Sequence, residues 1–140
     1  MLSMESHRAY AKVDLTGNVA SASPVRLVQM LYDGALKAIW AAQEHIKQQN
    51  VSGKGQSITK AIAIIGELDA SLNHEVGGEI SSRLSALYDY MTRRLLHANL
   101  KGDPLVLKEV EDLLSALREA WVEIANLPEE ALNPAPAKAR

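Results

Sequence analysis

The sequence predicts an all-α fold, an antiparallel up-down four-helix bundle. Phenylalanine is absent and aromatic residues make up only 4% of the chain, so the core has to be built from aliphatic side chains. Strong helix formers outnumber strand formers in every long segment. Apolar residues also recur at steps of three and four in four segments of roughly 20 to 25 residues with short connections, which favours antiparallel neighbours. We expect this bundle to occupy residues 23–127.

The first helix is expected to begin at Ser23-Pro24. A serine side chain accepts a hydrogen bond from a free first-turn N–H, and proline at the first helical position loses no bond. Residues 1–22 carry no sustained helical period and include the turn signal Thr16-Gly17-Asn18, so we expect a mobile N-terminal arm. The apolar face of this helix consists of Val25, Val28, Leu31, Tyr32, Leu36, Ile39 and Ile46.

The second helix is expected from about Gln56 to His74. Polar residues and glycines from Gln48 to Gly55 predict a loop before it, and Gly77-Gly78 predicts a break after it. Its apolar set consists of Ile58, Ala61, Ile62, Ile64, Ile65, Leu68 and Leu72.

The third helix is expected to start near Glu79 and to end before Lys101-Gly102, and the fourth begins with the cap-and-proline pair Asp103-Pro104. Pro128 ends the fourth helix, and residues 128–140 predict a disordered tail. The third helix carries Ile80, Leu84, Leu87, Tyr88, Met91 and Leu95 on one face, and the fourth carries Val106, Val110, Leu113, Leu117, Trp121 and Ile124.

Composition and charge exclude several classes of protein. The chain has no cysteine, which excludes disulfides and thiolate metal sites. Its 15 basic and 17 acidic residues give a formal charge of −2 without the clustered positive charge of a nucleic-acid site. The N-terminus lacks a long apolar run, and no stretch approaches the roughly 18 apolar residues of a membrane span. We expect a soluble cytoplasmic domain without membrane insertion.

The motifs of bundle enzymes are also missing. A di-iron bundle needs Glu-x-x-His on two helices, and neither such a pair nor His-Glu-x-x-His occurs. The four histidines are scattered along the chain, at His7, His45, His74 and His97. The stretch from Ser52 to Gly55 is glycine-rich but lacks the strand and spacing of a phosphate loop. We therefore expect no enzyme, no cofactor and no metal site.

Some apolar residues lie beside or away from the expected core stripe of their helix. They are Leu27, Met30, Ile64, Leu68, Tyr90 and Leu96. A wide core face with scattered surface apolar residues would account for any one of them. Taken together, they favour an apolar groove that accepts a partner helix or an extended segment.

Several blocks of the sequence, in this order along the chain, resemble FliS flagellar chaperones. The blocks run from Ala22 to Pro24, Leu27 to Leu36, Lys60 to Ile65 with Glu67-Leu68, Gly77 to Ile80, Leu87 to Met91 with Arg94-Leu95, and Leu117 to Trp121. The segments MLYDGAL and LYDYM are the most specific of them. The likeness extends from about Tyr10 to Ile124.

The resemblance implies a binding function rather than catalysis. Members of this family hold the disordered C-terminal segment of flagellin, prevent its premature polymerisation and assist its delivery to a component of the flagellar type III export gate. It also implies that the N-terminal arm can cover the groove, for which Tyr10 is the candidate. We expect the flagellin groove to be formed by Ile58, Ile62, Ile65, Leu68 and Leu72 of the second helix with Tyr90 and Leu96 of the third.

A second hypothesis is a four-helix adaptor that sequesters a regulatory protein. It can coexist with the chaperone function, and recovery of the bound partners from cells would distinguish the two. A small-ligand or metal-binding bundle enzyme is a third class, for which the sequence offers little support.

Overall fold

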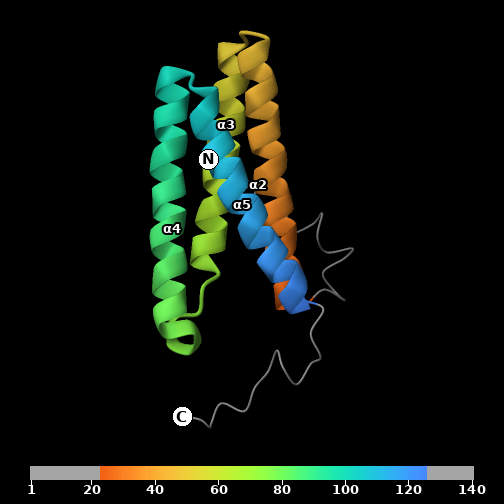
Figure 1. Ribbon diagram of the computed structural model, residues 1–140, viewed down its shortest axis with the longest axis vertical. Helices are drawn as coiled ribbons and strands as arrows, with labels where there is room; N and C mark the ends of the chain where they lie inside the picture. Colours follow the sequence, from red (N-terminus) through yellow and green to blue (C-terminus); the bar gives the residue numbers. More distant parts are fainter. Residues whose placement is uncertain (1–22, 126–140) are drawn as a thin grey trace, which may run out of the picture.

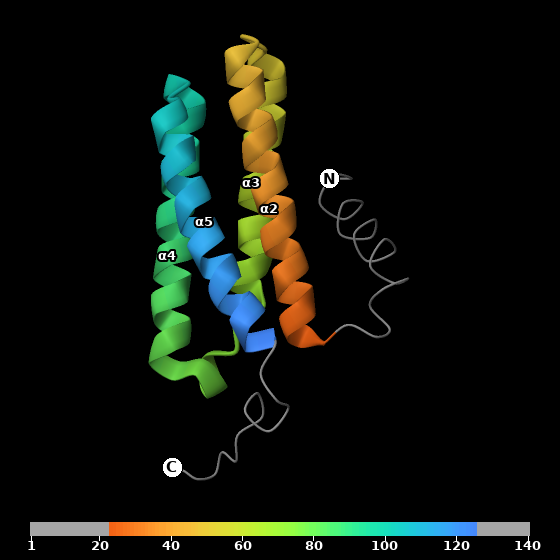
Figure 2. The ribbon, with the colours of Figure 1, turned by 45° about the vertical axis from the view of Figure 1, so that its right-hand side comes forward.

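The computed structural model describes residues 23–125 and confirms the all-α prediction. It contains α2 (Pro24–Lys47), α3 (Val51–Ala70), α4 (His74–Lys101) and α5 (Pro104–Ala125). The helices alternate in direction and pack as an antiparallel bundle (Figures 1 and 2). The expected arm over 1–22, with Tyr10, and the tail over 128–140 lie outside the described residues.

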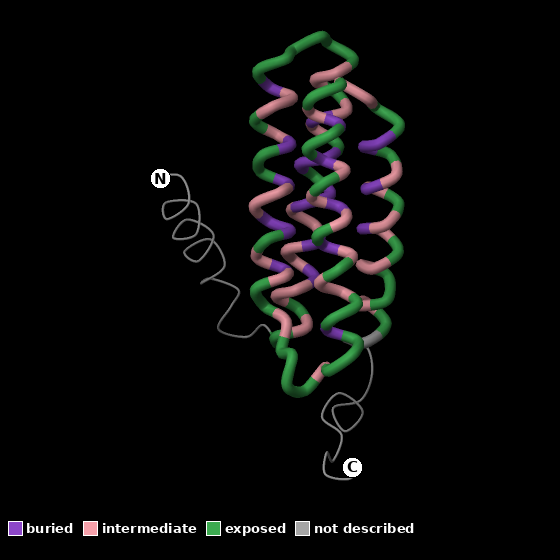
Figure 3. The backbone as a smooth tube through the Cα atoms, turned by 90° about the vertical axis from the view of Figure 1, so that its left-hand side faces the viewer, coloured by how far each residue is buried: buried purple, intermediate pink, exposed green. Residues whose placement is uncertain are grey.

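The core runs along the bundle axis. Each helix directs its buried positions inward and its exposed positions outward, as Figure 3 shows, and α2 packs most closely against α3. The largest fully buried side chains are Tyr32, Ile39, Ile58, Ile65, Leu68, Met91, Leu95, Leu107, Val110 and Leu114. The core is therefore aliphatic except for tyrosine, as the missing phenylalanine predicts.

The expected start of α2 and the expected end of α4 are confirmed by their caps. The Ser23 hydroxyl accepts a hydrogen bond from the backbone N–H of Arg26 at 3.1 Å, and proline follows at the first helical position. At the end of α4, Gly102 has a φ of 64° and donates its N–H to the Ala98 carbonyl at 2.7 Å. A left-handed φ there favours glycine because it lacks a Cβ.

The loop predicted from Gln48 to Gly55 is wrong, because α3 begins at Val51. The Asn50 side chain caps the helix by accepting from the Gly53 N–H at 2.9 Å. Gly53 is buried where α3 meets α2, and a Cβ there would lie 2.5 Å from Nδ1 of His45. This glycine therefore permits close helix packing and does not break the helix.

The prediction that α3 ends at His74 is also wrong. The helix ends at Ala70, and the Ser71 hydroxyl donates to the Leu68 carbonyl at 2.7 Å. Asn73 then caps the next helix, so His74 is the first residue of α4. The two glycines that follow do interrupt the chain, since Gly78 has a φ of 52° and a ψ of −121° inside α4.

Replacing Gly53 by alanine is expected to destabilise the protein by about 1–3 kcal/mol, because the new methyl group would overlap the His45 ring. Gly66→Ala on the same helix is the matched control, since a Cβ at Gly66 meets nothing within 4 Å. The control should stabilise the protein by about 0.5–1 kcal/mol through helix propensity. Urea denaturation measures both changes, and equal effects of the two substitutions would contradict the packing role of Gly53.

Candidate partner-binding surface

The residues expected to line a groove fall into three groups in the structure. Ile58, Ile65 and Leu68 are fully buried in the core. Ile62, Leu72 and Tyr90 are half-buried and pack against that core, whereas 55% of Leu96 is exposed. Three of the seven residues thus stabilise the bundle from inside, and the other four reach its surface.

A shallow depression lies where the N-terminal half of α3 meets the C-terminal half of α4. Its volume is about 480 Å³, and it is lined by Val51, Ser52, Gly55, Gln56, Thr59 and Asn99. The Lys54 ammonium donates to the Asn99 carbonyl at 2.8 Å and ties the two helices together there. We call this surface, with the adjoining positions Ile62 and Leu96, the α3–α4 seam.

Helical spacing places both apolar residues at the edge of this depression. Leu96 lies three residues before Asn99, and Ile62 lies three residues after Thr59. Three residues correspond to a rotation of about 60° short of a full turn, so each pair shares one side of its helix. The groove expected from the sequence contains none of the residues that line this depression. Val51 falls in the predicted loop, and Thr59 and Asn99 are polar residues that apolar periodicity does not select. The sequence does carry one sign of this depression. Gly55 and Thr59 are small residues four positions apart, so they lie on the same side of the helix.

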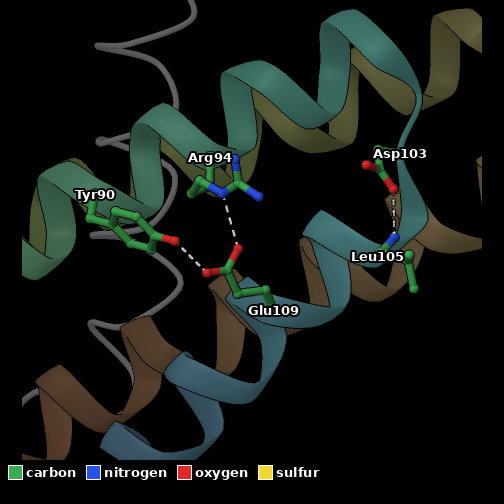
Figure 4. A network of polar contacts seen from close by, with 5 residues as sticks. All are labelled: Tyr90, Arg94, Asp103, Leu105 and Glu109. Atoms are coloured by element: carbon green, nitrogen blue, oxygen red, sulfur yellow. Dashed lines mark hydrogen bonds and ion pairs between the residues drawn. The ribbon is translucent and has the colours of Figure 1, made fainter.

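Tyr90 belongs to a different surface. It lies six residues from Leu96, which separates the two by about 120° around α4. Its hydroxyl donates to the Glu109 carboxylate on α5, and Nε of Arg94 donates to the same carboxylate at 3.0 Å (Figure 4). The hydrogen bonds from Tyr90 and Arg94 lower the pKa of Glu109. The structure therefore places Tyr90 in a contact between α4 and α5, away from the seam.

A second polar network crosses the interior of the bundle. The hydroxyls of Tyr32 on α2 and Tyr88 on α4 lie 2.5 Å apart, and the Trp121 indole N–H of α5 donates to the Tyr32 hydroxyl at 3.3 Å. Burial raises the pKa of both tyrosines, so both phenols are neutral at physiological pH. The network links α2, α4 and α5, because the Tyr32 hydroxyl is hydrogen-bonded both to Tyr88 and to Trp121.

The described residues also bear on metal and membrane binding. Residues 23–125 contain no group of three or more histidine or acidic side chains placed to hold a metal ion. Within the same range, none of the helices combines the length and the apolar character needed to cross a bilayer.

Comparisons with known proteins give a consistent result. A model of the family described as flagellar protein FliS matches residues 6–128. The chain is 50% identical to the flagellar secretion chaperone FliS of Salmonella typhimurium over 119 residues, which cover 84% of this chain and 88% of that protein. It is 43% identical to the Escherichia coli protein of the same name, covering 88% and 91% of the two chains. A Pseudomonas aeruginosa relative named flagellar secretion chaperone FliSB is 36% identical, covering 90% and 100%.

Proposed function

The chain belongs to the FliS family of flagellar secretion chaperones, and we propose that its cargo is the disordered C-terminal segment of flagellin. Binding in the cytoplasm would prevent premature polymerisation and keep flagellin ready for delivery to a component of the export gate. The identity of 50% to a named secretion chaperone over most of both chains is the observation that carries this proposal.

The physical basis of the proposal is the covering of an amphipathic segment. A flagellin segment that forms helices in the filament carries an apolar face, which has to be covered before assembly. Binding to a preformed surface can fold such a segment, at a cost in ordering entropy that offsets part of the interaction energy. The bundle supplies such a surface. Its own side chains fill the core, so the helices are packed in place without a partner.

We propose that the α3–α4 seam is the part of the surface that contacts flagellin. The seam combines an open depression with the exposed Leu96 and the half-buried Ile62. Ile58, Ile65 and Leu68 would support it from the core, and Leu72 would extend it beyond the C-terminal end of α3. Tyr90 would act indirectly by fixing α4 to α5. The role of Tyr10 as a cover for this surface remains a prediction.

Leu96→Glu is expected to weaken binding of a peptide from the flagellin C-terminus by about tenfold or more, because a carboxylate would have to be desolvated in an apolar contact. Calorimetric titration of the full chain with the peptide measures this change. The wild-type protein should give a saturable one-to-one complex with a strongly negative heat-capacity change.

Val76→Glu is the matched control for this experiment. Val76 is 83% exposed and lies at the start of α4, far along the helix from Leu96. The control should bind like wild type, and both variants should keep the wild-type melting temperature. Equal affinities of the two variants would exclude the seam, whereas no binding by the folded wild-type protein would exclude flagellin as direct cargo and favour a regulatory partner.

A further inference from the structure

The side of α3 that borders the depression of the seam continues to the C-terminal end of this helix. Gly55, Ile62 and Asp69 follow one another at steps of seven residues. Seven residues make almost two full turns, so these three positions lie along one side of α3. Gly55 lines the depression, Ile62 borders it, and Asp69 lies about two turns farther along the helix. Asp69 therefore continues the seam beyond the depression.

A matching row of polar residues runs along α4. Ser85, Thr92 and Asn99 are also seven residues apart and share one side of this helix. A Cβ on Gly55 would lie 3.9 Å from the side-chain oxygen of Asn99, so the two rows face each other at the depression. The two helices are antiparallel (Figure 2). Equal spacing along both rows then places Asp69 opposite Ser85.

Asp69 lies close to Tyr88 of α4 but is not hydrogen-bonded to it. Burial is the largest cause of the raised pKa of the Tyr88 phenol, and the negative charge of Asp69 adds to it. The Tyr88 hydroxyl is bonded to Tyr32, whereas Oδ1 of Asp69 is buried and makes no hydrogen bond within residues 23–125. None of the ion pairs in that range includes Asp69. A buried carboxylate oxygen without a donor destabilises a fold, so the packing of the bundle does not account for this aspartate.

The surface around Asp69 is open to a partner. Gly66 lies one turn before Asp69, is exposed, and would have no atom within 4 Å of an added Cβ. Asp69, Ser85 and Thr92 are half-buried, so each is partly accessible to solvent. We call these four residues the polar end of the seam.

We propose that the polar end of the seam binds a lysine or arginine of the flagellin segment through the Asp69 carboxylate. This inference rests on the proposed function and adds a specificity-determining contact to it. A cationic partner fits best, because a partly buried carboxylate gains more from a charged donor than from a neutral one. The hydroxyl oxygens of Ser85 and Thr92 can accept further N–H groups of the same cation. The apolar part of the seam would supply contact area, and Asp69 would fix the register of the cargo along it.

Calorimetric titration of the full chain with the flagellin C-terminal peptide tests this contact. Asp69→Asn keeps the size of the side chain but removes its charge, so it should raise the Kd by about tenfold or more. Asp112→Asn is the matched control, because Asp112 is an exposed aspartate of α5, pairs with Lys108 and lies off the seam. The control should bind the peptide like wild type. Added salt should weaken binding by the wild type more than binding by Asp69→Asn.

Peptide variants identify the cation that Asp69 binds. Each lysine and arginine of the peptide is replaced in turn by glutamine. One of these replacements should raise the Kd of the wild-type chain by about the same factor as Asp69→Asn does. The same replacement should have almost no further effect on Asp69→Asn, as a double-mutant cycle across a direct pair requires.

The melting temperature of the free chain separates a cargo contact from a structural role. Asp69→Asn should keep or raise the melting temperature, because it removes a partly buried charge that has no donor. A lower melting temperature would show that a group of this chain pairs with Asp69, and it would overturn the proposal.

Two results of the titrations would also overturn it. These are a wild-type Kd in Asp69→Asn, or independent effects of Asp69→Asn and every peptide replacement. If Leu96→Glu loses binding while Asp69→Asn keeps it, flagellin remains the cargo and only the contact with Asp69 is excluded. No binding by the folded wild-type protein would exclude both the cargo and this contact.

Discussion

Tyr32→Ala is expected to lower the free energy of unfolding by about 3–5 kcal/mol, as substitutions of large buried aromatic residues by alanine do. Tyr32 is completely buried in α2, so the substitution opens a cavity in the core. It also removes the hydroxyl that contacts Tyr88 of α4 and accepts from Trp121 of α5. Urea denaturation followed by circular dichroism measures the loss.

Tyr32→Phe separates the cavity from the polar contribution. It keeps the ring but leaves the Tyr88 hydroxyl and the Trp121 N–H without their shared partner, at an expected cost of about 1–3 kcal/mol. Adding Tyr88→Phe removes one of the two unpaired groups, so the double variant should lose less than the sum of the single variants. Additive losses would contradict a direct hydrogen bond between the two tyrosines.

Ile65→Ala is expected to lower the free energy of unfolding by about 2–5 kcal/mol, because the side chain is buried and a cavity would replace it. Ile80→Ala on the exposed side of α4 is the matched control, with an expected change within about 0.5 kcal/mol. Urea denaturation of the two variants measures both values.

The Ile65 experiment also tests the division of roles on α3. If Ile65 only supports the seam from the core, the folded fraction of Ile65→Ala should bind the flagellin peptide with an affinity close to that of the wild type. A Kd that rises by more than the unfolded fraction explains would show that Ile65 contacts the cargo directly. Ile65 would then have to become exposed when the cargo binds.

Several features of the fold follow directly from the sequence, because local chemistry decides them. Ser23-Pro24 and Asp103-Pro104 identify two helix starts because capping and proline geometry act within one turn. Gly102 and Gly78 mark an end and a break because both have a positive φ. Gly53 has no positive φ, and its reason for being glycine is the His45 ring of another helix. The local glycine rule therefore predicted a loop where the protein forms a helix.

The candidate site also combines features that local sequence predicts with features that depend on contacts between helices. Apolar periodicity identified the aliphatic helices, and the order of the family blocks identified the chaperone family. Periodicity could not separate Ile65, which is buried, from Ile62, which reaches the surface, nor could it show that Tyr90 contacts Glu109 of α5. The sequence alone determined the helical fold class, because capping and amphipathic spacing are properties of neighbouring residues, and the order of its blocks indicated the family. The tertiary structure decided which apolar residues stay exposed, because that depends on which other helix covers each side.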